Sequence, residues 1–502
     1  MKKVLLIIYF ILFKLTNCYL FSIIISIYNT ARYLDDSIGS LLNQTIGIEA
    51  IQIILVNDGS TDNSEDICLK YKKLFEKNII YIKIEHCGVS QARNVGLNFA
   101  KGKYINFLDS DDKWDSHAFI YIHMFFEMHN DIDIIGGRIK LFGARNNYHF
   151  LDYKFNSTRV VNLTQEYNCI QLSASSSFFR RTSIKQNKFK PNVYFGEDIR
   201  FIHNILFINP LIGLVREVIY YYRKRSDSSS AIQNTEKNKE YYFSTINSVH
   251  QYLIDKSYSL YNKIAPFIQF FIAYDILFRL SSLAYNYLDT SNYSKYCDTI
   301  ENLLRQVDDK YILEQNVLSS RIKIYALSKK YNKDIRYDMV LRSNYIKYSN
   351  YQMIDLKKYN NIIVWRKLEI KGHNIHLEGE DKFWLPRERF NYFCKIGNEK
   401  FFPIYYYCSD YDFKTMYGII DKGRIVSFNL KLETKDLHQI HFYISFSNNS
   451  IEIFPSFNIF VHKLKEKANK KDIYYIIIFF QLFLILKLLL RMKIIKLLED
   501  SK

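Results

Sequence analysis

The sequence predicts an α/β fold whose first domain is a doubly wound, mostly parallel sheet. Three observations support this prediction. Short apolar runs, nearly continuous as in strands buried on both faces, recur in the first hundred residues. Segments with the apolar spacing of helices lie between these runs. Aspartates follow two of the runs, at Asp58 and Asp109, and open α/β sheets bind ligands at the carboxyl ends of their strands.

Strand and helix alternate in order along this part of the chain. We expect strands at 21–27, 51–56, 79–84 and 104–108, and helices at 31–43, 65–75 and 90–100. In the first helix Leu34, Ile38 and Leu41 fall on one side, which is typical of a helix packed on a sheet. The turn at 57–64 is rich in residues that cap helix N-termini, so it is expected to open the second helix.

The whole chain of 502 residues is long enough for roughly three domains. Changes in pattern divide it into five expected regions: an apolar N-terminal extension at 1–19, the α/β domain at 20–230, a helical region at 231–350, a small antiparallel β-sandwich-like domain at 351–460, and a basic and apolar helix at 461–502. Period-two alternation in the fourth region predicts the sandwich. Its aromatic residues either stack on sugars or form its core: Trp365, Trp384 and 405–407.

The net charge indicates which binding partners suit the protein, and the cysteine content indicates the redox state of its compartment. The formal net charge of +18 favours anionic partners such as lipid head groups, lipid-linked phosphates or nucleotides. Nucleic acid is the rival partner, but no nucleic-acid-binding motif is present, so we expect none. The seven cysteines are scattered without a CxxC pair, which argues against a zinc site or disulfide framework and favours a reducing compartment.

Both ends of the chain carry apolar segments. Residues 473–490 are apolar apart from Gln481 and Lys487, and as a helix they would reach about 27 Å, which is marginal for a bilayer. Basic residues flank this run, so we expect a helix at the cytoplasmic face of a membrane, peripheral or as a single anchor; a buried C-terminal helix is the alternative. The shorter run at 4–13 is a signal, an anchor or an extension.

An acidic cluster closes the fourth expected strand. Asp109 and Asp111 are separated by one residue, so their side chains point the same way from an extended chain. Such a pair can hold a hard divalent cation, Mg²⁺ or Mn²⁺, and the cation can hold a diphosphate. The alternative is a solvated acidic turn, which is the usual interpretation when such a cluster stands alone.

The cluster does not stand alone. Motifs in order at 24–29 (IISIYN), 56–62 (VNDGSTD), 88–94 (GVSQARN) and 107–112 (FLDSDD) resemble the successive signatures of family-two glycosyltransferases, as do the later segments 175–181, 195–201 and 220–225. The resemblance covers roughly 20–230 and implies a GT-A fold, a nucleotide-sugar donor and inversion of the anomeric carbon. Ser26 stands where the family usually has proline.

The resemblance also implies roles for single residues. Asp58 would accept a hydrogen bond from the donor base, and a carboxylate suits the imide N–H of uracil; capping the following helix is its alternative role. Asp111 would bind the metal directly, and Asp109 would face the ribose or a metal-bound water. The remaining donor-site residues implied by the resemblance are Tyr28, Arg93, Asp112 and Arg223. Arg93 could instead form a surface ion pair, and Asp112 could only orient its neighbours.

Inversion needs one base beside the acceptor hydroxyl. Asp198 resembles that base, and Glu197 would bind acceptor hydroxyls or replace Asp198 as base. The alternative for both is an acidic pair favoured by a helix dipole. We therefore expect a metal-assisted, inverting hexosyltransferase that uses a nucleotide-diphosphate sugar, a UDP-sugar in our interpretation, and a glycan or lipid-linked acceptor.

Two other functions compete with this prediction. A sugar-1-phosphate nucleotidyltransferase shares such a sheet, but it needs a glycine-rich basic loop after the first strand, which the segment 28–32 is not. A non-catalytic carbohydrate-binding scaffold would need neither Asp111 nor Asp198.

Overall fold

The computed structural model describes residues 19–226 apart from 185 and 194, residues 238–356 apart from 283, 343 and 344, and, with further short gaps, residues 363–454. The chain divides into two compact units, one comprising the residues up to Arg279 with Ala284–Leu318, the other Leu280–Leu283 with the residues from Ser319 onward.

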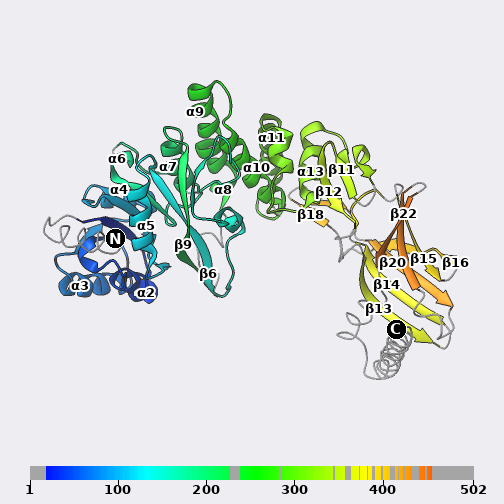
Figure 1. The fold of residues 1–502 in the computed structure, drawn as a ribbon, viewed down its shortest axis with the longest axis horizontal. Helices are drawn as coiled ribbons and strands as arrows, with labels where there is room; N and C mark the ends of the chain where they lie inside the picture. Colours follow the sequence, from blue (N-terminus) through cyan, green and yellow to red (C-terminus); the bar gives the residue numbers. More distant parts are fainter. Residues whose placement is uncertain are drawn as a thin grey trace, which may run out of the picture. The chain divides into compact units, whose positions relative to one another are not determined.

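The first unit contains a nine-stranded sheet whose main order is β3-β2-β1-β4-β8-β6-β9-β5, with β7 beside β9. Its strands are β1 (Phe21–Ile27), β2 (Ile51–Asp58), β3 (Ile79–Ile84), β4 (Tyr104–Asp109), β5 (Lys113–Trp114), β6 (Ile134–Gly143), β7 (Arg159–Asn162), β8 (Ser177–Arg180) and β9 (Leu211–Lys224). Strands β3, β2, β1 and β4 are parallel, and β8 joins them antiparallel. The expected mostly parallel sheet is confirmed (Figure 1).

Helices cover both faces of this sheet. They are α2 (Ala31–Leu42), α3 (Ser64–Leu74), α4 (Val89–Leu97), α5 (Ala118–Met128), α6 (Arg181–Ile184) and α7 (Glu197–Leu206). Ile23 and Ile25 of β1 belong to one hydrophobic core with α2 and α5. Ile24 faces the other way, and a Cβ at Gly96 of α4 would lie only 2.4 Å from its Cγ2, so this glycine permits the close approach of α4. Figure 1 shows α4 on the opposite side of the strands from α2 and α3.

The strand register brings the two expected ligand positions to one edge. β1 lies between β2 and β4, with Ile27 opposite Asn57 and Ser26 opposite Asp109. Asp58 ends β2 and Asp109 ends β4, so both carboxylates lie at the carboxyl edge, on either side of β1. This is the edge at which parallel sheets bind ligands.

The first unit continues into helices that follow β9. They are α8 (Lys239–Thr245), α9 (Tyr252–Tyr261), α10 (Pro266–Leu280), α11 (Thr290–Gln306) and α12 (Asp309–Leu313). This agrees with the helical region expected at 231–350, and Phe267, Phe271 and Leu277 of α10 are buried. Arg279 is buried on the same helix and pairs with Asp275 at 2.5 Å.

The second unit begins with α13 (Ser320–Tyr331) and contains the expected small antiparallel sheets. One has the order β10 (Val340–Arg342), β11 (Tyr345–Tyr348), β12 (Tyr351–Asp355). A four-stranded sheet has the order β13 (Ile363–Lys371), β14 (Asn374–Asp381), β20 (Arg424–Lys431), β17 (Ile404–Tyr407). A second four-stranded sheet has the order β16 (Glu399–Phe401), β15 (Asn391–Ile396), β21 (Ile440–Phe446), β22 (Asn449–Phe454). The strands β18 (Phe413–Thr415) and β19 (Gly418–Asp421) form a two-stranded sheet.

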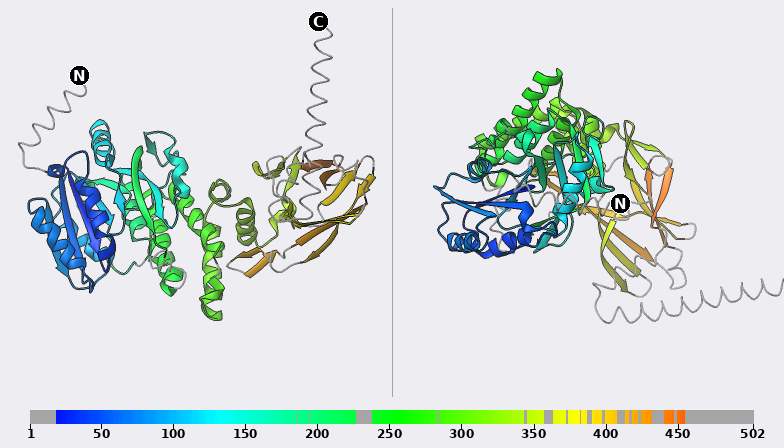
Figure 2. Two further views of the ribbon diagram at one scale, coloured as in Figure 1. Left: turned by 90° about the horizontal axis from the view of Figure 1, so that it is seen from below. Right: turned by 60° about the vertical axis from the view of Figure 1, so that its left-hand side comes forward.

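The two four-stranded sheets pack face to face. The rings of Phe428 on β20 and Phe442 on β21 have centroids 5.4 Å apart, and both side chains are buried. The hydroxyl of Tyr392 on β15 donates to Asp381 on β14. Trp384 is buried as well, which favours the core interpretation over sugar stacking for that residue. Figure 2 gives further views of these strands.

The predicted C-terminal helix at 461–502 and most of the N-terminal extension lie outside the described residues. Within the described part, no helix is both long enough and apolar enough to cross a bilayer.

Candidate active site

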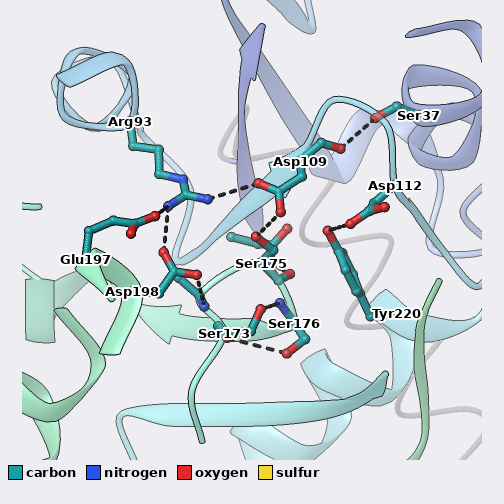
Figure 3. Close-up of polar contacts among 12 residues, drawn as sticks. Ser37, Arg93, Asp109, Asp112, Ser173, Ser175, Ser176, Glu197, Asp198 and Tyr220 are labelled. Atoms are coloured by element: carbon teal, nitrogen blue, oxygen red, sulfur yellow. Dashed lines mark hydrogen bonds and ion pairs between the residues drawn. The ribbon is translucent and has the colours of Figure 1, made fainter. Parts of the chain in front are cut away.

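Arg93 joins three carboxylates from two segments of the first unit, the end of β4 and the first turn of α7. Its side chain is only 4% exposed. Nη2 donates to Oδ1 of Asp109 at 2.9 Å, and Nη1 donates to Oδ1 of Asp198 at 2.6 Å and to Oε1 of Glu197 at 3.2 Å (Figure 3). The guanidinium also lies 5.1 Å from the ring centroid of Phe189. Burial excludes the expected alternative of a surface ion pair for Arg93.

Helix starts explain why these side chains meet. α4 begins after Gly88, whose φ of 89° suits glycine, and it carries Arg93 toward the sheet edge. α7 begins after Gly196, whose φ is 84°, and its first turn contains Glu197 and Asp198. Negative charge is favoured at a helix N-terminus, so the dipole interpretation and the contact with Arg93 both apply to this acidic pair.

The second oxygen of two of these carboxylates is held by the segment Ser173–Ser177, which we call the serine segment. The hydroxyl of Ser175 donates to Oδ2 of Asp109 at 2.8 Å. The main-chain N–H of Ala174 donates to Oδ2 of Asp198 at 2.9 Å. Asp109 and Asp198 are therefore each held between Arg93 and the serine segment, which fixes the direction in which their remaining lone pairs point.

Burial controls the protonation of the acidic pair. It raises the pKa of Glu197 to about 8, an effect increased by the charge of Asp198 and opposed by Arg93. Burial also raises the pKa of Asp198, while Arg93 and the N–H of Ala174 act to lower it. The pKa of Arg93 is raised because the three carboxylates outweigh the effect of its burial. A carboxyl group with a raised pKa can exchange a proton near neutral pH, as a general base must.

Asp111 lies in a basic part of the same edge. Arg225 donates from Nη2 and Nε to Oδ2 of Asp111, at 2.6 and 3.0 Å. Arg223 donates from Nε to the main-chain oxygen of Asp111 and from Nη2 to Asp36, both at 2.7 Å. Burial raises the pKa of Asp111, against the effect of Arg225. The two arginines thus bring positive charge to the expected diphosphate position.

Asp112 is held by the sheet. Its side chain is buried and accepts hydrogen bonds from the hydroxyl of Tyr220 and the main-chain N–H of Arg223, both at 2.7 Å. These contacts tie the acidic turn to β9 and support the alternative in which Asp112 orients its neighbours. Burial, together with the nearby charges of Asp111 and Asp109, raises the pKa of Asp112 well above its usual value.

Asp58 holds the turn that leads into α4. Its two oxygens accept from the main-chain N–H groups of Cys87 and Gly88, at 2.8 and 2.9 Å. The ring of His86 stacks on Tyr28 with centroids 4.0 Å apart, and Tyr28 is 45% exposed. The role of Asp58 in base recognition stays a prediction, and the exposed pair of rings beside it is a surface on which a base could stack.

The acidic turn fits a cation that is held largely by its substrate. Among the described residues, no group of three or more His, Cys, Asp or Glu side chains could hold a metal by itself. Both oxygens of Asp109 already have partners, whereas the ion pair of Asp111 uses Oδ2 alone. One carboxylate oxygen combined with substrate phosphates is a usual arrangement for Mg²⁺, so the residues present fit such a cation.

The structure brings most of the predicted site residues to one sheet edge. Arg93, Asp109, Glu197 and Asp198 form one contact group. Asp111 and Asp112 of the acidic turn form a second with Arg223 of β9. Asp58 lies across β1 from Asp109, and Tyr28 directly follows β1. The sequence analysis assigned no role to the serine segment or to His86, although the run SASSS is an unusual concentration of small polar residues.

Comparisons with known proteins show which family and which relatives this chain resembles. Residues 22–187 match the family model "Glycosyl transferase family 2". The chain is 33% identical to the minor teichoic acid biosynthesis protein GgaB of Bacillus subtilis over 85% of its own length and 48% of GgaB. It is 35% identical to GgaA of the same organism, also called a minor teichoic acid biosynthesis protein, over 59% of the chain and 69% of GgaA.

A solved structure shows the same fold. The crystal structure of S. aureus TarS superposes with a TM-score of 0.53 at 17% identity, covering 86% of this chain and 77% of that one. The chain spans about half the length of GgaB, so the similarity does not by itself assign the activity of GgaB to this chain. The family match and the identity to GgaA, read with the four ordered motifs on a GT-A-like sheet, show that the chain belongs to glycosyl transferase family 2.

Proposed function

We propose that this protein transfers a sugar from a nucleotide-diphosphate sugar, a UDP-sugar, to a hydroxyl of a teichoic-acid-type or other lipid-linked envelope glycan, with inversion at the anomeric carbon. One observation carries the proposal. Arg93 connects Asp109, at the end of β4 where a donor diphosphate would lie, with Asp198, the proposed acceptor-side base. Donor and acceptor groups would therefore meet above a single buried guanidinium.

The chemical step follows from the carboxylate geometry. The acceptor oxygen attacks the anomeric carbon, the bond from that carbon to the diphosphate oxygen breaks, and the acceptor proton passes to Asp198. Asp198 is oriented for this role because Arg93 and Ala174 hold one oxygen each, leaving further lone pairs on both. Glu197, protonated below about pH 8, can donate a hydrogen bond to an acceptor hydroxyl.

The leaving nucleoside diphosphate needs positive charge. Arg223 and Arg225 supply it at the turn that carries Asp111. A divalent cation, Mn²⁺ or Mg²⁺, would be held by Asp111 and would supply electrostatic stabilisation of the leaving diphosphate.

The acceptor class is supported by the names of the relatives and by charge. GgaA and GgaB are both called minor teichoic acid biosynthesis proteins. A net charge of +18 suits a polyanionic polymer and the surface of a membrane that carries its lipid-linked precursor. We place the protein at the cytoplasmic face of that membrane, where nucleotide sugars are available.

A donor screen tests the proposal. Wild-type protein and the Asp198→Asn variant are incubated with single UDP-sugars and a teichoic-acid-type acceptor, with and without Mn²⁺, and nucleoside diphosphate release is measured. At least one UDP-sugar should give acceptor-dependent release by the wild type that rises with Mn²⁺ and is lost in the variant. Equal release by both proteins with every donor would contradict the proposed function.

A further inference from the structure

The conformation of the serine segment is set by buried side chains rather than by a helix or a sheet ladder along its whole length. Only Ser177, its last residue, belongs to a strand, β8. Yet this segment presents Ser175 to Asp109 and Ala174 to Asp198. A shift of the segment would move both carboxylates, and a misplacement of about 1 Å can lower a rate by a factor of about 10².

Asn106 holds one side of the serine segment. This residue of β4 is fully buried, and its Nδ2 donates to the main-chain oxygens of Ser175 and Ser177, both at 2.8 Å. Its Oδ1 accepts from Nε1 of Trp114 at 3.1 Å. Because an indole N–H can only donate, Trp114 fixes which end of the amide faces the serine segment.

Gln171 holds the other side in the same way. Its Nε2 donates to the hydroxyls of Ser176 and Ser177, both at 2.9 Å. Its Oε1 accepts from Nζ of Lys154 at 2.7 Å, and Lys154 is itself buried in the 3₁₀ helix Phe150–Phe155. Nζ also donates to the main-chain oxygen of Ile170. Burial lowers the pKa of Lys154 to about 7, and both the ammonium and the neutral amine carry the N–H groups that these two bonds need, so Lys154 orients the Gln171 amide as Trp114 orients that of Asn106.

We propose that Asn106 and Gln171 are positioning residues of the transfer reaction: two buried amides, each oriented by a neighbour that donates to its oxygen, that hold the serine segment where it orients Asp109 and Asp198. The expected effect on the transfer rate rests on the proposed function. The claim that the two amides hold the serine segment in place does not depend on that function. Buried amides are costly unless every group is paired, and networks that are fully paired specify one local conformation.

Gln171→Met is the principal test, because it removes both donors and the acceptor while keeping the length and apolar character of the side chain. Its matched control is Gln315→Met. Gln315 is also buried in the first unit and donates to the main-chain oxygens of Phe270 and Tyr311, away from the carboxylates. Both variants lose buried hydrogen bonds, so a general loss of stability would appear in each of them.

A second variant perturbs the amide without removing a polar group. A Cβ at Gly136 would lie 2.9 Å from Oε1 of Gln171, so Gly136→Ala should displace the Gln171 amide. This variant keeps the test decisive if Gln171→Met does not fold.

Hydrogen exchange of the folded proteins tests the geometric part. Exchange at the amides of 174–177 should become faster in Gln171→Met and Gly136→Ala and stay unchanged in Gln315→Met, because the Ala174 N–H loses its fixed partner on Asp198. Unchanged exchange in both site variants would overturn the inference, whether or not the protein transfers sugar.

Kinetics test the consequence. We expect kcat to fall by a factor of about 10 to 10² in both site variants, with the KM for donor little changed. The acid limb of the kcat/KM profile should also move to higher pH, because the Ala174 N–H acts to lower the pKa of Asp198. A kcat and an acid limb like those of Gln315→Met would overturn the positioning role, whereas a wild type without any transfer would count against the proposed function alone.

Discussion

Nη1 of Arg93 lies 2.6 Å from Oδ1 of Asp198, although 105 residues separate them in the sequence. Arg93 comes from the helix after β3, and Asp198 from the helix that precedes β9. The same guanidinium reaches Asp109 at the end of β4. A buried arginine with three carboxylate partners therefore serves as the structural centre of the site, and its place beside the nucleotide, which the family resemblance implied, stays a prediction.

Arg93→Met should destabilise the first unit strongly. The variant leaves Asp109, Glu197 and Asp198 without their shared cation, and breaking a buried pair in this way typically costs about 3–5 kcal/mol. Thermal or denaturant unfolding measures the change. Arg305→Met is the control, because Arg305 is half exposed beside Glu301 and such surface pairs contribute little. Equal stability of the two variants would show that Arg93 does not hold the carboxylates together.

Asp198→Asn should lower the transfer rate by a factor of about 10² to 10⁴ while donor binding persists. The amide keeps the shape of the side chain but cannot take up the acceptor proton. Steady-state kinetics and donor titration measure the two effects. Near-normal transfer by this variant would move the base to Glu197.

Glu197→Gln should change the pH dependence more than the maximal rate. Glu197 has a pKa raised to about 8 by its burial, so below that pH it is protonated and neutral, and glutamine imitates this form. Above about pH 8 the ionised wild-type residue competes with Asp198 for Arg93, so wild-type activity should fall there. We expect the variant to retain activity below pH 8 and to lose this alkaline limb in a kcat/KM profile. A complete loss of activity at pH 7 would instead identify Glu197 as the base.

Asp111→Asn should raise the Mn²⁺ concentration needed for half-maximal turnover by at least tenfold, because a charged oxygen ligand is lost. Excess chelator should abolish wild-type turnover. Asp115→Asn is the matched control, because Asp115 lies directly after β5 and accepts from the main-chain N–H of His117. Full wild-type activity in chelator would remove the metal from the mechanism.

Local pattern predicted the strands well, because buried parallel strands are continuous apolar runs. The bounds expected for β1 and β3 agree with the structure. The observed β2 and β4 are slightly longer than expected and end at Asp58 and Asp109. The motif spacing also placed the acidic turn and Glu197–Asp198 at element ends. These are features that a short stretch of chain determines by itself.

The partners of these side chains could not be predicted in the same way. Which residue meets Arg93 depends on the crossover order of the sheet and on where α7 begins, and neither is encoded near residue 93. The motif at 175–181 was recognised, but the role of the serine segment was missed for a related reason. The segment is held by Asn106 and Gln171, which lie in an apolar strand and an unremarkable loop. A buried amide within an apolar strand, as at Asn106, is the signal that could have indicated it.

The last prediction concerns the segment beyond the described residues. Residues 473–490 are almost wholly apolar and are flanked by lysines, so their sequence suits the surface of an anionic membrane. We expect the full chain to sediment with anionic vesicles at low salt, and a chain ending at residue 457 to remain in the supernatant. The shortened chain should still hydrolyse donor slowly, because Asp111 and Asp198 are retained, but it should glycosylate a lipid-linked acceptor poorly. If the full chain stays in the supernatant with such vesicles, the membrane surface plays no part in bringing the acceptor to the site.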